Sequence, residues 1–213
     1  MKNFLFPALS VLILTSCTKD AIELSTTSVN NPDHKVETTS SQNNTAIVQA
    51  VSVTIKYTIR AGQHYCDQNT LKSIRVSQMN FTAKFDNSAI YTTIDPVNQY
   101  DINKLYGFSE GFNHQYNSAR IGWAYNNGAL RLYAYVYNKG VRLSTEITTV
   151  NIGVENNCSI KLSGYNYIFT VNGVSKTLSR ANSTSTASGY QLYPYFGGDE
   201  VAPQNINIYI TNL

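Results

Sequence analysis

The feature that most constrains the fold is a two-residue alternation of apolar and polar side chains that begins after residue 50. Between residues 51 and 60 every second side chain is apolar, and the intervening ones are Ser, Thr, Lys or Arg. Successive side chains of a strand point to opposite faces, so this pattern predicts a half-buried strand. The same pattern recurs at residues 80–86, 88–93, 104–109, 118–126, 129–138, 141–150, 158–164, 165–172, 174–179, 190–196 and 205–211. Residues 70–79 fit either a strand or a helix.

Two-residue turn signals join several of these runs. They are Asn127-Gly128, Lys139-Gly140 and Asn172-Gly173, a composition typical of β-hairpin turns. Short, regularly spaced strands with turn signals indicate a sandwich or barrel, and no repeat of fixed period supports a propeller. We therefore predict an all-β fold, an antiparallel β-sandwich over residues 50–213.

The N-terminus has the pattern of an exported lipoprotein. Lys2 is followed by an apolar run over residues 4–14, which is typical of a secretory signal peptide and too short to span a bilayer. The sequence Leu-Thr-Ser-Cys at residues 14–17 resembles the lipobox of bacterial lipoproteins, which implies cleavage after residue 16 and lipidation of Cys17. Attachment through more than one acyl chain would be stable. The alternative is an ordinary signal peptide with an incidental cysteine.

Residues 17–49 differ in composition from the rest of the chain. They are rich in Ser, Thr and Asn, contain no aromatic residue, and show no periodicity. Such a segment buries too little apolar surface to offset its ordering entropy, which predicts a flexible tether. The expected location is the bacterial envelope, with the chain anchored to the outer membrane on its periplasmic or external side.

Charge and aromatic content restrict the partners. Charged residues make up 14% of the chain and the net charge is +3, which argues against a nucleic-acid binder. The chain holds 16 Tyr against 8 Phe and 1 Trp. Tyrosine suits surfaces that are half apolar and half wet, so we expect a polar ligand site with aromatic walls.

The turns at 127–128 and 139–140 fix the register of three strands. They place Trp123 opposite Leu132, and Leu132 opposite Ile147, with apolar side chains on one face throughout. A one-residue slip would destroy this match. The opposite face then carries Arg120, Arg131, Tyr133, Tyr135, Tyr137, Arg142 and Glu146.

That polar face suggests carbohydrate recognition. Tyr rings stack on sugar rings, whereas Arg binds carboxylates through paired hydrogen bonds. We predict that the face binds a glycan or another extracellular polymer without catalysis. The alternative is a solvated sheet surface whose cross-strand pairs only stabilise the sheet, as in a structural or adhesive surface protein.

A catalytic alternative centres on His114 in the loop at residues 111–116. A neutral His beside Tyr135 can take the C5 proton of a uronic acid while Arg120 holds its carboxylate. Polysaccharide lyases cleave by such a β-elimination. No paired carboxylates suited to glycoside hydrolysis are present, because Glu110, Glu146 and Glu155 stand alone. No cofactor is predicted.

Metal sites have little support in the sequence. His64 lies near Cys66 and Asp67, but no second cluster completes a metal site. Asp199 in a glycine-rich loop is a candidate for structural calcium, and a plain turn is the favoured interpretation there. Cys66 and Cys158 remain after lipidation of Cys17. Outside the cytoplasm they either form a disulfide, which we favour, or remain two buried thiols.

Four motifs resemble uncharacterised envelope lipoproteins of the Bacteroidota. They are L-Y-G-F-S-E at 105–110, N-S-A-R-I-G-W at 117–123, L-Y-A-Y-V-Y-N-K-G-V-R at 132–142 and Y-P-Y-F-G-G-D-E-V-A-P at 193–203. The resemblance covers residue 51 to the C-terminus and implies a concanavalin A-like jelly roll in the envelope, with no known activity. Alginate-lyase-type jelly rolls share that architecture and a face of Arg, Gln, His and Tyr. Their R-S-E-L-R and Q-I-H motifs are absent, and the nearest counterparts are Arg120 and His114-Gln115.

Overall fold

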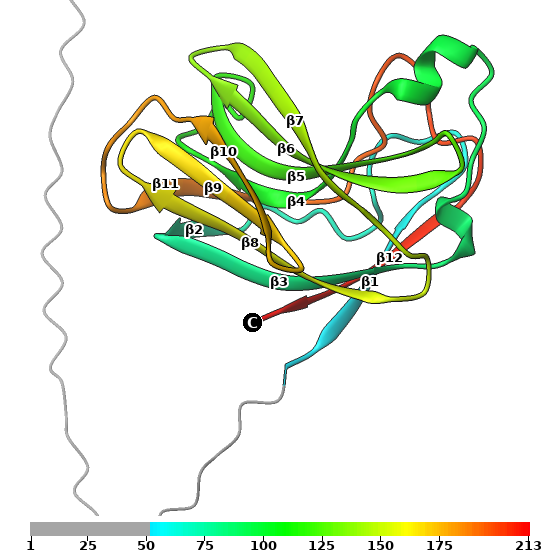
Figure 1. Ribbon diagram of the computed structural model, residues 1–213, viewed down its shortest axis with the longest axis horizontal. Helices are drawn as coiled ribbons and strands as arrows, with labels where there is room; N and C mark the ends of the chain where they lie inside the picture. The colour runs from blue at the N-terminus through cyan, green and yellow to red at the C-terminus, as the bar shows by residue number, and fades with distance from the viewer. Residues whose placement is uncertain (1–51) are drawn as a thin grey trace, which may run out of the picture. The chain divides into compact units, whose positions relative to one another are not determined.

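The computed structural model describes residues 52–213 (Figure 1). The expected signal peptide at 1–16, the lipidation site Cys17 and the expected tether at 17–49 lie outside the described residues. Within 52–213, no helix is both long and apolar enough to cross a membrane.

Residues 52–213 form two six-stranded antiparallel sheets. The first sheet contains, in spatial order, β1 (Thr54–Ile59), β12 (Ile206–Asn212), β3 (Gln78–Phe85), β8 (Glu155–Ser163), β9 (Asn166–Val171) and β10 (Val174–Ser179). The second contains β2 (Ser73–Val76), β11 (Ala187–Leu192), β4 (Asn103–Ser109), β5 (Asn117–Asn126), β6 (Ala129–Asn138) and β7 (Val141–Val150). Two short 3-10 segments, η1 (Asn87–Ala89) and η2 (Pro96–Tyr100), precede β4. The predicted antiparallel β-sandwich is confirmed.

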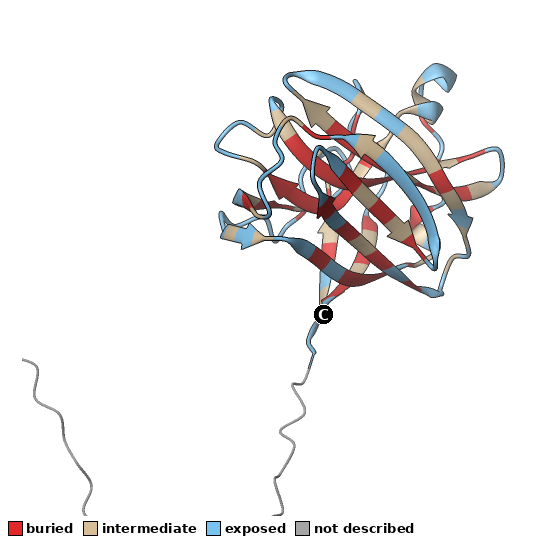
Figure 2. Ribbon diagram, turned by 60° about the vertical axis from the view of Figure 1, so that its left-hand side comes forward, coloured by how far each residue is buried: buried red, intermediate tan, exposed pale blue. Residues whose placement is uncertain are grey.

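Apolar side chains of the two sheets meet in a shared core. The rings of Phe85 from β3 and Trp123 from β5 lie 5.4 Å apart, and those of Phe81 and Tyr106 lie 5.1 Å apart. Burying each such side chain contributes about 1.5–3 kcal/mol. Buried and exposed positions alternate along β8 and β9 (Figure 2). Because β5 buries Ala119 and Ile121 in this core, Arg120 between them points to the outer face of the second sheet.

The predicted hairpin turns are confirmed: those at 127–128 and 139–140 join β5, β6 and β7, and that at 172–173 joins β9 to β10. Asn127, Lys139 and Asn172 have φ of 50°, 51° and 48°, each followed by a glycine with positive φ, which is the geometry of type I′ turns. Trp123 lies opposite Leu132 as predicted.

One register prediction was wrong. Leu132 pairs with Thr148, and the next residue, Tyr133, pairs with Glu146, so Ile147 is the extra residue of a β-bulge. A regular ladder from the 139–140 turn would also bury Ile147. The bulge therefore changes the pairing of Leu132 but leaves Ile147 in the core.

One further assignment differs from the sequence prediction, and one open assignment is resolved. The strand expected at 88–93 is absent, because the Asp86 side chain accepts a hydrogen bond from the Ser88 N–H at 2.9 Å and starts η1 instead. The ambiguous residues 70–79 form β2 and the start of β3.

Candidate functional site

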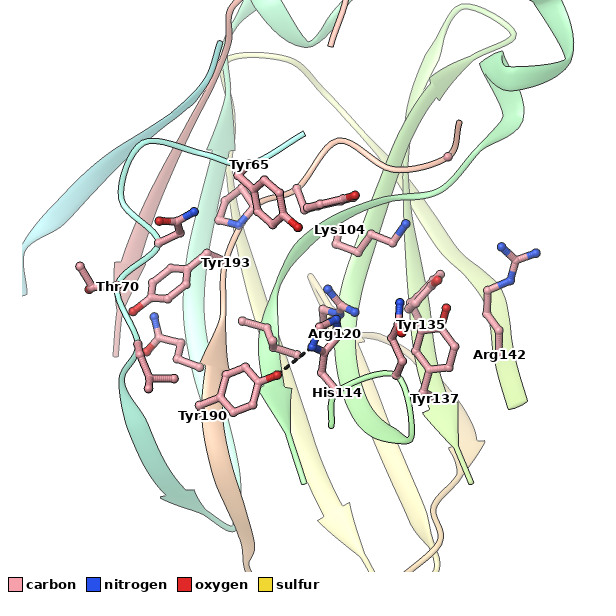
Figure 3. A pocket seen from close by; sticks show the side chains of 18 of the residues that line it. Tyr65, Thr70, Lys104, His114, Arg120, Tyr135, Tyr137, Arg142, Tyr190 and Tyr193 are labelled. Atoms are coloured by element: carbon pink, nitrogen blue, oxygen red, sulfur yellow. Dashed lines mark hydrogen bonds between the residues drawn. The ribbon is translucent and has the colours of Figure 1, made fainter. Parts of the chain in front are cut away.

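A cleft of about 590 Å³ opens on the outer face of the second sheet (Figure 3). Its lining combines side chains of the sheet with side chains of the loop between β1 and β2 and of the segment that follows β11. The residues from the strands include Lys104 of β4, Arg120 of β5, Tyr135 and Tyr137 of β6, Arg142 of β7 and Tyr190 of β11. The loop after β4 adds His114 and Gln115.

Arg120 is the most unusual group in the cleft. The residue is only 6% exposed, its Nε has no hydrogen-bond partner, and neither of the ion pairs of residues 52–213 involves it. Its guanidinium lies over the Tyr135 ring, with Cζ 5.8 Å from the ring centroid. Burial lowers the pKa of Arg120, although arginine stays charged in proteins. A buried charge without a counter-charge is costly, so this guanidinium is well suited to an anionic ligand.

A glycine gives Arg120 its space. Gly107 of β4 is the cross-strand partner of Arg120, and a Cβ at Gly107 would overlap the backbone of Ala119 and Arg120 and the Arg120 side chain. The arginine therefore lies close over β4 at the bottom of the cleft. Only a residue without a side chain permits this approach.

His114 forms a pair with Tyr190. The His114 Nδ1 lies 2.7 Å from the Tyr190 hydroxyl, and the His114 carbonyl accepts a 2.6 Å hydrogen bond from Ser118 Oγ. Gly111 starts this loop at a φ of 80°, and its N–H donates to the Ser188 carbonyl. Burial, and then the charge of Arg120, lower the pKa of His114 below its usual range. His114 is therefore neutral at pH 7 and able to accept a proton.

Lys104 adds a second cation beside Arg120. Its Nζ lies 5.2 Å from the centroid of Tyr135 and 5.6 Å from that of Tyr195. Burial lowers the pKa of Lys104 to about 8, with further lowering by Arg120 and Arg142. The ammonium therefore remains mostly charged at pH 7. Together with Arg142 at the edge of the cleft, these side chains make the sheet side of the cleft cationic.

The structure brings together only part of the predicted binding face. Arg120, Tyr135, Tyr137 and Arg142 line the cleft as expected. The other three predicted residues, Arg131, Tyr133 and Glu146, do not line it.

Internal pairing explains that difference. Arg131 forms an ion pair with Glu146 at 3.0 Å, and its Nε donates to Asn126 Oδ1 at 2.8 Å. Both charges are thereby satisfied on the sheet itself, which is the structural alternative considered for this face. Arg131, Tyr133 and Glu146 therefore lie outside this cleft, and their assignment to a ligand site stays a prediction.

The predicted catalytic set also needs a correction. His114, Arg120 and Tyr135 share the cleft, but the tyrosine hydrogen-bonded to His114 is Tyr190 and not Tyr135. Tyr135 is 2% exposed, and burial together with the neighbouring Tyr137 raises its pKa to about 12. Sequence reasoning missed Tyr190 and Lys104. The tyrosines at 190, 193 and 195 were the available signal, but their neighbours in space depend on strand order.

The cysteine and metal predictions have simple outcomes. Cys66 and Cys158 are both buried free thiols, so the disulfide that we favoured is absent from the described part of the chain.

His64, the histidine near Cys66 and Asp67, has its Nδ1 2.9 Å from the Phe196 carbonyl. Residues 52–213 contain no cluster of three or more His, Cys, Asp or Glu side chains that could hold a metal ion, so calcium near Asp199 has no support. Asp199 instead lines the cleft.

No family model matches the chain, and no curated protein matches it. Several solved structures are similar. A family 7 alginate lyase with bound product has 12% identity and a TM-score of 0.46, with 75% of this chain and 76% of that chain covered. An alginate lyase from Alteromonas sp. 272 has 9% identity and a TM-score of 0.46, with 80% and 88% covered. A functionally unknown protein from Saccharomyces cerevisiae has 8% identity and a TM-score of 0.46, with 77% and 86% covered.

Proposed function

We propose that the cleft binds an acidic polysaccharide and cleaves it by β-elimination at a uronic acid residue. The observation that carries this proposal is the hydrogen-bonded pair of His114 and Tyr190 in the same cleft as the buried, unpartnered Arg120. A proton acceptor, a hydroxyl donor and a carboxylate-binding cation are the three groups that this reaction requires.

Arg120 would hold the carboxylate of the reacting sugar. When a base removes the C5 proton, negative charge spreads from C5 onto that carboxylate. A fixed guanidinium in a buried position stabilises this charge better than water does, because it needs no reorganisation during the reaction. Lys104, whose Nζ also lies over the Tyr135 ring, strengthens the same positive field.

His114 and Tyr190 would move the protons. With the proton of neutral His114 on Nδ1 and donated to the Tyr190 oxygen, Nε2 is free to take the C5 proton. The C4–O bond then breaks, a C4=C5 double bond forms, and the Tyr190 hydroxyl donates its proton to the leaving oxygen. Transfer of the Nδ1 proton to the tyrosinate restores two neutral groups. Because the pKa of His114 is below its usual range, the rate should fall only below about pH 6.5.

The proposal is tested by incubating the protein with a panel of uronic acid polymers and following the absorbance of the unsaturated product. His114→Asn and Tyr190→Phe should each lower the rate on the order of 10²-fold or more. Tyr165→Phe, which alters an exposed tyrosine outside the cleft, is the matched control. Retention of a polymer without any product would contradict catalysis and favour a binding protein. Absence of both would favour a structural surface protein.

We further propose that the chain reaches the envelope as a lipoprotein anchored through Cys17. The support is the apolar run at residues 4–14 followed by Leu-Thr-Ser-Cys. Labelling with an alkyne fatty acid in a bacterial host should modify the wild-type chain and leave Cys17→Ser unlabelled and released from the membrane fraction. Equal labelling of both chains would contradict the assignment.

A further inference from the structure

The two sides of the cleft differ in chemistry. The cations that line it, Lys104, Arg120 and Arg142, come from β4, β5 and β7. The opposite side is formed by residues 65–71 of the loop after β1 and residues 190–195, and these residues contribute no charged side chain to the lining. Asp199, further along the chain, adds a carboxylate to the lining. Figure 3 shows Thr70, Tyr190 and Tyr193 on this side, away from Arg142. The cleft is therefore cationic along the sheet and neutral along the loop.

An exposed tyrosine on the neutral side is held in place by a stack of rings. Tyr65 is 63% exposed, and its ring meets the Tyr195 ring edge-on at 4.9 Å and 82°. Tyr195 in turn stacks on His64 at 5.2 Å and 10°. Backbone pairing supports the rings, because Tyr65 forms a bridge with Tyr195, and the Phe196 N–H donates to the His64 carbonyl at 2.8 Å. A ring that is fixed before binding loses little entropy when a ligand covers it.

The lining residues that follow Tyr65 in the loop, Asn69, Thr70 and Leu71, carry no charge. Asn69 and Thr70 can hydrogen-bond hydroxyl groups, whereas Leu71 is apolar and 82% exposed. A carboxylate placed against residues 69–71 would lose hydration without gaining a counter-charge from them. A neutral sugar ring would instead place its apolar face on Tyr65 and its hydroxyls near Asn69 and Thr70.

We infer that the ligand is a mixed polysaccharide, in which a uronic acid residue bound at Arg120 adjoins a neutral sugar that stacks on Tyr65. This inference rests on the proposed acidic-polysaccharide site and specifies its substrate class. A polymer made only of uronic acids would place a second carboxylate against the uncharged side of the cleft. The cleft therefore selects polymers that alternate acidic and neutral residues.

The test compares two oligosaccharides of equal length, one of uronic acids only and one with alternating uronic acid and neutral hexose. Binding is measured by calorimetry on the His114→Asn background, so that both ligands stay intact. The alternating oligosaccharide should bind about tenfold more tightly, the order of magnitude of a strong contact residue. Tyr65→Ala should remove this preference and Tyr65→Phe should keep it. Tyr165→Ala, at 64% exposure outside the cleft, should change neither affinity.

A second variant should reduce the expected preference without altering the core. Leu71→Lys places a cation on the neutral side at an exposed position, so it should strengthen binding of the all-uronate oligosaccharide. Equal wild-type affinity for the two ligands, or an equal loss for both in Tyr65→Ala, would overturn the inference. The lyase proposal fails separately: a binding preference without any unsaturated product would leave the neutral subsite standing and reject catalysis.

Discussion

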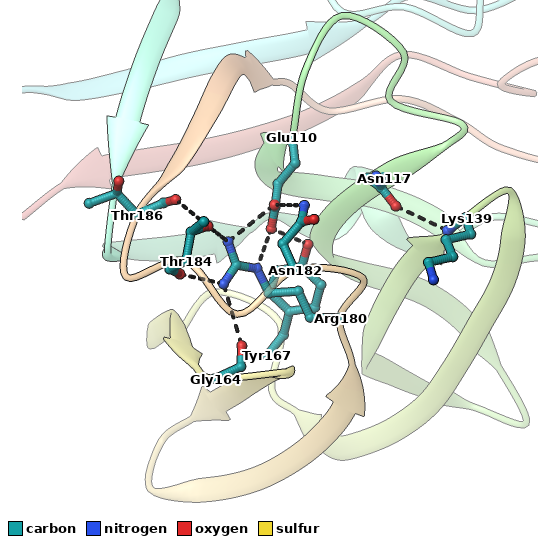
Figure 4. Close-up of polar contacts among 9 residues, drawn as sticks. All are labelled: Glu110, Asn117, Lys139, Gly164, Tyr167, Arg180, Asn182, Thr184 and Thr186. Atoms are coloured by element: carbon teal, nitrogen blue, oxygen red, sulfur yellow. Dashed lines mark hydrogen bonds and ion pairs between the residues drawn. The ribbon is translucent and has the colours of Figure 1, made fainter.

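Two buried arginines of this fold have opposite surroundings. Arg180, just after β10, is 2% exposed, and its guanidinium donates to both carboxylate oxygens of Glu110, at 2.5 and 3.1 Å, and to the Thr184 carbonyl at 2.6 Å (Figure 4). Arg120 is 6% exposed, has no ion-pair partner among residues 52–213, and leaves its Nε without a hydrogen bond.

The difference separates a structural arginine from one that we propose binds a ligand. Burying a guanidinium costs several kcal/mol wherever it occurs. At Arg180 the fold compensates that cost, because Glu110 after β4 and the Tyr167 hydroxyl of β9 meet in one network that connects the two sheets. At Arg120 the described chain supplies no such compensation. The missing counter-charge is what a ligand carboxylate would provide.

The largest expected effect is on stability and concerns Arg180. Arg180→Met leaves the Glu110 carboxylate buried without its partner, which should lower the free energy of unfolding by about 3–5 kcal/mol. Denaturation in urea measures this. Arg131→Met is the matched control: its pair with Glu146 is partly exposed, so the loss should stay below about 1 kcal/mol. Equal losses in the two variants would contradict the structural role of Arg180.

Arg120→Met should affect activity and not stability. Removing the carboxylate-binding cation should lower product formation on the order of 10²–10³-fold. The melting temperature should stay the same or rise, because the substitution removes a buried charge that lacks a partner. A melting temperature that falls as far as in Arg180→Met would show that Arg120 is also a structural group.

Acid should affect the Glu110 network before it affects the rest of the fold. Burial alone would raise the pKa of Glu110, but hydrogen bonds from Arg180, Tyr167 and Asn182 outweigh it and hold the pKa below its usual range. The resulting stabilisation is complete above about pH 4.3, the pKa of a glutamate in the unfolded chain. It is lost as pH falls through the pKa of Glu110 in the folded protein. Urea titrations should show a steeper loss below pH 4.3 in the wild type than in Glu110→Gln. Parallel curves would contradict this.

The smallest expected effect concerns Lys104. Because its pKa is lowered to about 8, its charge is lost as pH rises through that value. Affinity for an anionic oligosaccharide should therefore fall several-fold between about pH 7 and 9 in the wild type, on the scale of one screened charge pair. Lys104→Met should bind more weakly at pH 7 and show a flatter profile. An unchanged profile in this variant would exclude Lys104 from the ligand site.

Much of the fold follows from local pattern. The alternation and the turns such as Asn127-Gly128 predict most strands and the register of β5 with β6. The β-bulge at Ile147 and the short strand β2 were not predictable, because both depend on pairing with distant strands.

The site was predictable only in part. The outward face of β5 and β6 places Arg120 beside Tyr135, but Tyr190 reaches His114 across 76 residues of sequence and Arg180 reaches Glu110 across 70. Alternation also does not distinguish Arg131, which pairs with Glu146, from Arg120, which has no partner.

The most direct test follows the Nε–H resonances of Arg120 and Arg180 by NMR while a uronate oligosaccharide is added to the His114→Asn variant. Both groups are buried, so Arg180 serves as the internal reference. A ligand carboxylate bound to Arg120 should shift the Arg120 resonance in proportion to site occupancy and leave the Arg180 resonance in place. Saturating ligand that moves neither resonance, or moves both equally, would contradict the assignment of Arg120 as the carboxylate-binding group of the cleft.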